Sequence, residues 1–257
     1  MSTNMSIVDR VRFMDERVRV IDAGKALDEM PLHGNPRVVL HMFPSQPLEG
    51  VDVAAALGLS RLTAVSSDLT PPGALQPVTP GSFTRARSDD DGLLIYTGQD
   101  SELVGEAGNF DLVARDELTA HSYVRVFNNG TVEAVQATYY KKDQPPLLCR
   151  RYEKDILTAI PRYLIVQQRL GVELPVYVRL TVTGVMGGYI GDDKSKVVSG
   201  EITTPQLRLP DVAVNTFTPG ERAQLAEIMR EPFYKVWQAA GLPRSMNYDE
   251  DDRWAGH

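Results

Sequence analysis

The sequence holds a single cysteine, Cys149, among its 257 residues. A lone thiol cannot form an internal disulfide, so the chain suits a reducing compartment. No apolar run approaches the roughly 18 residues that a membrane-spanning helix needs, and the N-terminus lacks the apolar core of a signal peptide. These absences predict a cytoplasmic protein with no membrane segment.

Positive charge is also scarce. The chain has 27 Lys and Arg residues against 34 Asp and Glu residues, which gives a net charge of −7. The chain as a whole therefore lacks the basic character of an autonomous nucleic-acid-binding protein, although a local basic face stays open. Its length and its 42% hydrophobic content fit one globular domain that spans residues 1–257.

The familiar catalytic and ligand motifs are missing. There is no G-x-S-x-G elbow and no G-x-G-x-x-G loop, and the glycine-rich stretch 184–191 reaches Lys194 only after two aspartates, which would repel a phosphate. The four histidines show no spacing typical of metal ligands; they are His33, His41, His121 and His257. We expect His41, inside an apolar run, to be a hydrogen-bonded core residue. The sequence predicts no catalytic, cofactor-binding or metal-binding residues.

The clearest strand lies within residues 174–191. Val176, Val178, Leu180 and Val182 alternate with polar residues over eight positions, which is the period of a half-buried strand. We expect it to be central, with the helices of the chain packed against it. Residues 37–43 predict a second, buried strand, and residues 82–87 and 92–97 predict two short strands around an acidic turn at 88–92. That turn lacks the spaced ligands of a calcium loop and is interpreted as a solvated hairpin tip.

Residues 123–137 predict a β-hairpin. Asn129 and Gly130 lie between two extended runs and suit a two-residue type I′ turn. That register places Arg125 opposite Ala134.

Two helices are predicted at 148–170 and 218–240. The first contains Pro161, which favours a kink or two helices end to end. The second begins with Thr218, Pro219 and Glu221, a typical N-cap pattern. Residues 44–81 form a Pro-rich irregular segment with one short helix at 51–57. Residues 247–257 predict a loose polar tail, which Trp254 could tie down. We therefore expect an α+β fold: a mostly antiparallel sheet, helices packed on one face, and an N-terminal helical arm.

That arm is predicted at residues 5–24. Its apolar side chains recur at steps of three and four and form a narrow seam; they are Ile7, Val11, Met14, Val18 and Ile21. A narrow seam resembles a coiled-coil contact. We expect this helix to dock on a protein partner or on a second copy of the chain, whereas packing on its own domain is the plainer interpretation.

A local basic edge is predicted near the start of the first long helix. It consists of Lys141, Lys142, Arg150 and Arg151. Aromatic residues at 139–140 precede it, a combination that nucleic-acid-binding surfaces use. For residues 139–142, an exposed strand end is the plainer interpretation.

Several segments together resemble a known arrangement. They are the N-terminal helix (11–24), RVVLHMFP (37–44), YVRVFNNGTVEAV (123–135), LPVYVRLTVTGVMG (174–187), and LPDVAV (209–214) followed by FYKVWQAAGLPRSMNYD (233–249). The chain resembles the C-terminal region of bacterial proteins that carry a Schlafen-type AlbA domain and are labelled as ATP-binding or DNA-binding. The resemblance implies a companion module without the AlbA domain itself, so neither nucleotide nor nucleic-acid binding carries over and no functional residue transfers.

Three function classes remain. The first is a non-catalytic interaction or regulatory module of a bacterial regulatory or defence system. The second is a nucleic-acid-associated transcriptional regulator that uses the basic edge. The third is a hydrolase or nuclease with an unrecognised carboxylate site.

Overall fold

The structure, a computed structural model, describes residues 7–27, 31–32, 34–57, 74–75, 82–106, 109–138, 144–192, 194, 196–218, 220 and 222–256. The helices are α1 (Ile7–Asp22), α2 (Val53–Ala56), α3 (Tyr152–Arg169) and α4 (Arg222–Ala239). The strands are β1 (Arg37–Pro44), β2 (Ser82–Asp89), β3 (Gly92–Glu106), β4 (Asn109–Phe127), β5 (Val132–Ala137), β6 (Leu147–Cys149), β7 (Val176–Thr183), β8 (Tyr189–Gly191), β9 (Gln206–Arg208) and β10 (Val212–Val214).

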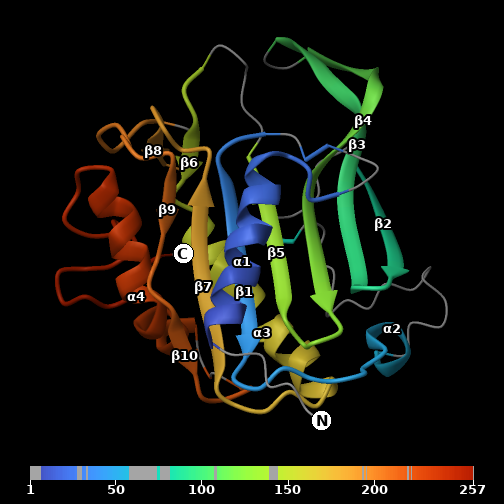
Figure 1. The fold of residues 1–257 in the computed structure, drawn as a ribbon. Helices are drawn as coiled ribbons and strands as arrows, with labels where there is room; N and C mark the ends of the chain where they lie inside the picture. Colours follow the sequence, from blue (N-terminus) through green and yellow to red (C-terminus); the bar gives the residue numbers. More distant parts are fainter. Residues whose placement is uncertain are drawn as a thin grey trace.

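One antiparallel sheet dominates the fold (Figure 1). Its strands follow the order β10-β7-β1-β5-β4-β3-β2, and β9 also pairs with β7. A separate parallel pair joins β6 and β8. The predicted α+β class and the mostly antiparallel sheet are confirmed. The alternating stretch becomes β7, an interior strand between β1 and the short strands β9 and β10, one position from the end of the sheet.

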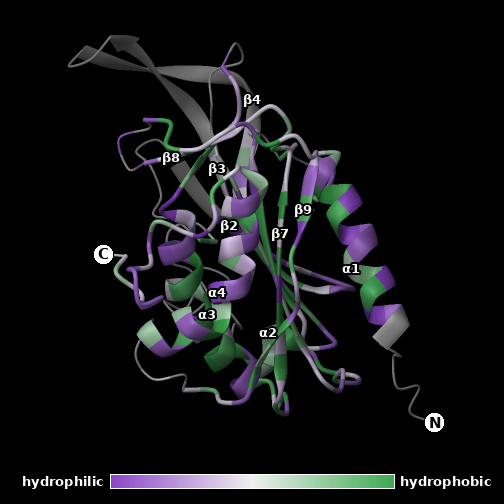
Figure 2. Cartoon of the chain, turned by 90° about the vertical axis from the view of Figure 1, so that its left-hand side faces the viewer, coloured by the Kyte–Doolittle hydropathy of each residue, from purple (hydrophilic) through white to green (hydrophobic). Residues whose placement is uncertain are grey.

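Both faces of the sheet are covered. Along β1, Val38, Leu40 and Met42 belong to a large apolar core that includes residues of α3 and α4. Val39, which points the opposite way, belongs to a smaller core with Val18 of α1. Figure 2 shows α1 on one side of the sheet and both long C-terminal helices on the other.

The predicted helical arm is therefore part of the domain. α3 and α4 share one face of the sheet as expected, but α1 lies flat on the opposite face. Met14, Val18 and Ile21 are only 1%, 3% and 0% exposed. A narrow apolar stripe is enough to pack α1 on the sheet because the sheet face beneath the helix is partly polar. The helix contacts that polar part with a charged side chain, as described below.

The hairpin at β4 and β5 differs from the prediction by one residue. Arg125 lies opposite Glu133, not Ala134. Gly130 N donates to Phe127 O at 2.9 Å, and Phe127 N donates to Thr131 O at 2.8 Å, so three residues form the loop. Only Gly130 in this loop has a positive φ, +82°, whereas a type I′ turn needs two such residues. The shift turns Glu133 onto the α1 face.

Three further segments can be compared with their predictions. The short helix expected at 51–57 is α2, while residues 58–73 and 76–81 lie outside the described part. α3 runs unbroken through Pro161. Residues 247–256 are not a loose tail, because Asn247 and Tyr248 are only 8% and 5% exposed.

Candidate functional site

A row of polar side chains crosses the α1 face of the sheet. Arg125 on β4 lies opposite Glu133 on β5. Glu133 in turn lies opposite His41 on β1, which lies opposite Arg179 on β7. Directly opposite residues in an antiparallel sheet share a face, so these four side chains line up. Charged groups in such a place need partners, because an unpaired buried charge is strongly unfavourable.

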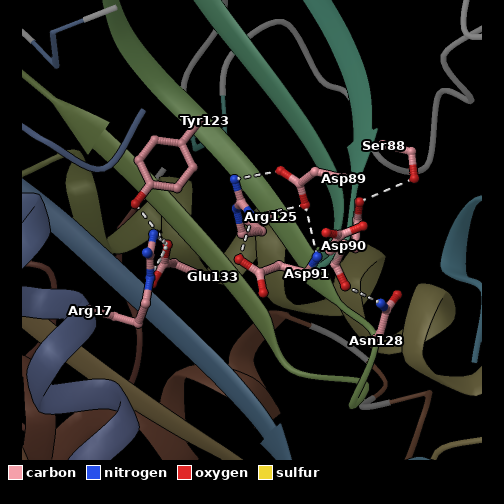
Figure 3. A network of polar contacts seen from close by, with 10 residues as sticks. Arg17, Ser88, Asp89, Asp90, Asp91, Tyr123, Arg125, Asn128 and Glu133 are labelled. Carbon is pink, nitrogen blue, oxygen red and sulfur yellow. Dashed lines mark hydrogen bonds and ion pairs between the residues drawn. The ribbon is translucent and has the colours of Figure 1, made fainter. Parts of the chain in front are cut away.

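Glu133 is fully buried and is held by three side chains, of which Figure 3 shows Arg17 and Tyr123. Arg17 from α1 contacts both carboxylate oxygens, with Nε 3.0 Å from Oε2 and Nη2 2.8 Å from Oε1. The Tyr123 hydroxyl donates to Oε1 at 2.7 Å, and His41 Nε2 lies 2.9 Å from Oε2. His41 is thus the hydrogen-bonded core residue that the sequence predicted. The bidentate pair fixes α1 on the sheet.

These contacts shift the pKa values of Glu133, Arg17 and Tyr123. Burial alone would raise the pKa of Glu133, but the hydrogen bond from His41 and the charge of Arg17 hold it well below its ordinary value of 4.5. Burial alone would lower the pKa of Arg17, and the Glu133 carboxylate more than reverses that effect. Burial, then the charge of Glu133, raises the pKa of Tyr123. An enclosed carboxylate that stays ionised is a structural charge, since a general acid or base must change its protonation and reach a substrate.

The acidic hairpin tip extends this network toward the surface. Arg125, itself 5% exposed in its side chain, lies 3.0 Å from an oxygen of Asp89 and 3.4 Å from one of Asp91. Asp91 is 75% exposed in its side chain, as expected for a hairpin tip. Asp89 instead neutralises Arg125. Within the described residues, no group of three or more His, Cys, Asp or Glu side chains is arranged to hold a metal ion.

A second buried carboxylate, Glu153, lies in the first turn of α3. Trp237 Nε1 and the Tyr152 hydroxyl donate to its Oε1 at 2.6 and 3.1 Å. Ser245 Oγ and Asn247 Nδ2 donate to its Oε2 at 2.8 and 2.9 Å. Burial raises the pKa of Glu153 to about 7, although the four hydrogen bonds oppose this shift. Glu153 therefore changes its protonation near neutral pH, whereas Glu133 stays ionised there.

Two of these donors belong to residues 245–256, which we call the C-terminal strap. Tyr248 pairs through its backbone with Trp254, and the two rings meet edge to face at 5.3 Å. The Tyr248 hydroxyl donates to Ala226 O of α4 at 2.7 Å. The strap is thus anchored on α4 and, through Glu153, on α3.

A cavity of about 510 Å³ lies between the start of α3 and the C-terminal strap. One side is cationic and consists of Arg150, Arg151 and Lys154. The strap supplies the other side, which consists of Met246, Asn247, Trp254, Ala255 and Gly256. Among the described residues, no Asp, Glu, His or Cys side chain lines this cavity, which we call the α3 pocket. Its cationic side chains suit binding of an anion.

The α3 pocket brings together half of the basic edge predicted from the sequence. Arg150 and Arg151 line it, whereas Lys141 and Lys142 lie outside the described residues. Arg151 is half exposed and lies 3.5 Å from Asp155. The backbone of Arg150 is fixed at both ends, since its N–H donates to Gly191 O at 2.8 Å and its carbonyl accepts from Asn247 at 3.1 Å.

The predicted docking residues lie on the opposite face of the molecule. Met14, Val18 and Ile21 are buried against the sheet, Val11 is half-buried, and the side chain of Ile7 is outside the described part. A smaller cavity of about 180 Å³ adjoins the helix; its lining is Arg10, Val11, Met14, Phe43, Ser45, Tyr177 and Asp211.

Several residues of these sites were not foreseen. Glu133 was missed because its face depends on the hairpin register. Lys154 stands four residues after Arg150, a helical spacing that could have added it to the basic edge. Trp237, Ser245 and Asn247 lie within the segment that carries the family resemblance, yet nothing in that segment points to a buried glutamate.

Within the described residues, no helix has the length and apolar character needed to cross a bilayer. Comparison of the chain with protein-family models, with curated proteins and with solved structures gave no match. The site therefore has to be interpreted from its own chemistry.

Proposed function

We propose that the chain is a non-catalytic regulatory module of a bacterial regulatory or defence system, companion to an AlbA-type domain. In this proposal the module acts in the cytoplasm and binds an anionic ligand in the α3 pocket. The observation that supports it is the lining of that pocket, where three cationic side chains meet and no Asp, Glu, His or Cys side chain is found among the described residues.

The buried carboxylates favour the same function. Glu133 and Glu153 are both 0% exposed and both are surrounded by donors from the chain itself. A hydrolase or nuclease of the third class would need a carboxylate within reach of its substrate, and the described lining of the α3 pocket holds none. The chemistry of this pocket is thus concentrated in cations, which favours binding.

A nucleic-acid-associated regulator is the second candidate. Arg150, Arg151 and Lys154 would contact phosphates, and Lys141 and Lys142 would extend the same edge. The net charge of −7 opposes this function, because it weakens the attraction of the whole chain for a polyanion.

The protein partner in this proposal is the companion AlbA-type module. A contact along the full predicted seam would require α1 to leave the sheet, since Met14, Val18 and Ile21 are buried there. That movement would also break the pair between Arg17 and Glu133. A partner would therefore meet the N-terminal half of α1, where Val11 adjoins the smaller cavity.

Titration of labelled DNA and RNA at about 50 and 200 mM salt separates the two candidates. We expect weak binding or none for the intact chain, with no difference between wild type and an Arg150→Gln, Arg151→Gln variant. Tight binding with a steep salt slope, lost in this variant but kept in an Arg12→Gln, Arg19→Gln control on α1, would instead establish the nucleic-acid function. Arg12 and Arg19 suit the control because their side chains are 78% and 73% exposed.

A further inference from the structure

The α3 pocket collects three cationic side chains. Arg150, Arg151 and Lys154 come from five consecutive positions and line one cavity. Asp155 lies 3.5 Å from Arg151, but it does not line the pocket. An anion in this space would lie close to all three positive charges. The arrangement therefore favours an anion that carries more than one negative charge.

The donors match phosphate better than carboxylate. Two guanidinium groups and one ammonium group can donate to several oxygens at once, and a terminal phosphate offers three oxygens and nearly two negative charges. A single carboxylate offers two oxygens and one charge. Trp254 also lines the pocket, and its buried indole N–H has no acceptor within the described residues.

The size and walls of the pocket favour a small molecule. A volume of about 510 Å³ lies in the usual range of small-ligand sites. The C-terminal strap lines one side, so the cations face a bounded space between two elements of the chain. Building on the proposed function, we infer that the α3 pocket binds the phosphate group of a small phosphorylated molecule between the start of α3 and the C-terminal strap.

Glu153 positions both walls of this site. Its carboxylate accepts from Ser245 and Asn247 of the strap, and it directly precedes Lys154 on α3. Asn247 also donates to the carbonyl of Arg150, which links the strap to the cationic wall at 3.1 Å. Ligand binding and docking of the strap are therefore coupled, with Glu153 as a positioning residue that does not line the pocket itself.

Isothermal titration calorimetry with the full chain tests this inference. The probes are pyrophosphate and citrate at matched ionic strength, because both carry several negative charges but only pyrophosphate carries them on phosphate. We expect pyrophosphate to bind at least about tenfold more tightly than citrate, as stronger charge-assisted bonds imply. The Arg151→Gln, Lys154→Gln variant should bind pyrophosphate at least about tenfold more weakly than the wild type.

The control is Arg222→Gln, Lys235→Gln, which removes two exposed charges on α4 away from the pocket. It should bind like the wild type, and circular dichroism should show both variants folded. If the Arg151, Lys154 variant is unfolded, Lys154→Gln alone provides the comparison. Citrate binding as tight as pyrophosphate binding would overturn the phosphate inference but keep an anion site. Binding of neither probe, or equal loss in both variants, would overturn the anion site and the proposed function together.

Discussion

The Glu133→Ala variant is expected to lose about 3–5 kcal/mol of folding free energy, because it leaves a buried cation without its partner. Arg17 pairs with both oxygens of Glu133, and His41 and Tyr123 lose the same acceptor. Urea unfolding followed by circular dichroism measures the loss. The folded chain lowers the pKa of Glu133 below its ordinary value of 4.5. The stabilisation that Glu133 gives to the folded state is therefore complete above pH 4.5 and is lost as the pH falls below 4.5 toward the folded pKa.

The matched control is Asp91→Ala. Asp91 also pairs with an arginine, Arg125, but at 3.4 Å and with its side chain 75% exposed. Its loss should change stability by no more than about 0.5 kcal/mol. An Arg17→Met, Glu133→Leu double variant should recover part of the loss, because it removes both charges of the pair, while His41 and Tyr123 still lack their acceptor. If Glu133→Ala costs no more than Asp91→Ala, the network does not hold α1.

Stability is expected to fall by up to about 3 kcal/mol as the pH rises from about 5 to about 8, because of Glu153. Its pKa is about 7 in the folded chain against an ordinary 4.5. Between these values the folded chain keeps a proton that the unfolded chain has lost, so folding is favoured by acid in this window. Urea unfolding of the wild type at several pH values measures the slope.

The Glu153→Gln variant should show a flatter pH dependence, whatever its stability at pH 5, because it cannot ionise. Glu133→Gln serves as the control. It removes the other buried carboxylate but should leave the slope between pH 5 and 8 unchanged, since Glu133 titrates at lower pH. Equal slopes in the wild type and Glu153→Gln would show that Glu153 does not titrate in this range.

Much of the fold could be predicted from local patterns. Alternation identified β7, an apolar run identified β1, and capping residues placed the start of α4 within a few positions. These features depend on residues close together in the sequence, and the regular repeat of a strand or helix fixes how such residues lie relative to one another. The side of the sheet on which α1 packs was not predictable in this way, because an amphipathic stripe does not specify which surface it covers.

The site was harder to predict for the same reason. Ser245 and Asn247 lie 92 and 94 residues from the glutamate that holds them. Arg17 and Glu133 are separated by 116 residues, and their meeting also depends on a one-residue choice of hairpin register. Arg150 and Arg151 could be proposed from sequence as a basic edge. That they face Trp254 across a cavity depends on tertiary packing alone.

The central claim, that the α3 pocket is an anion site, is tested most directly by nuclear magnetic resonance of the two indole N–H groups. The chain has two tryptophans, and their surroundings differ. Trp254 lines the pocket with an N–H that has no acceptor in the described part, whereas Trp237 donates to Glu153 at 2.6 Å. Trp254→Phe assigns the two peaks. As pyrophosphate is added at constant pH and ionic strength, the account predicts a saturable shift of the Trp254 peak that exceeds any shift of the Trp237 peak. A Trp254 peak that stays in place up to millimolar pyrophosphate would contradict it.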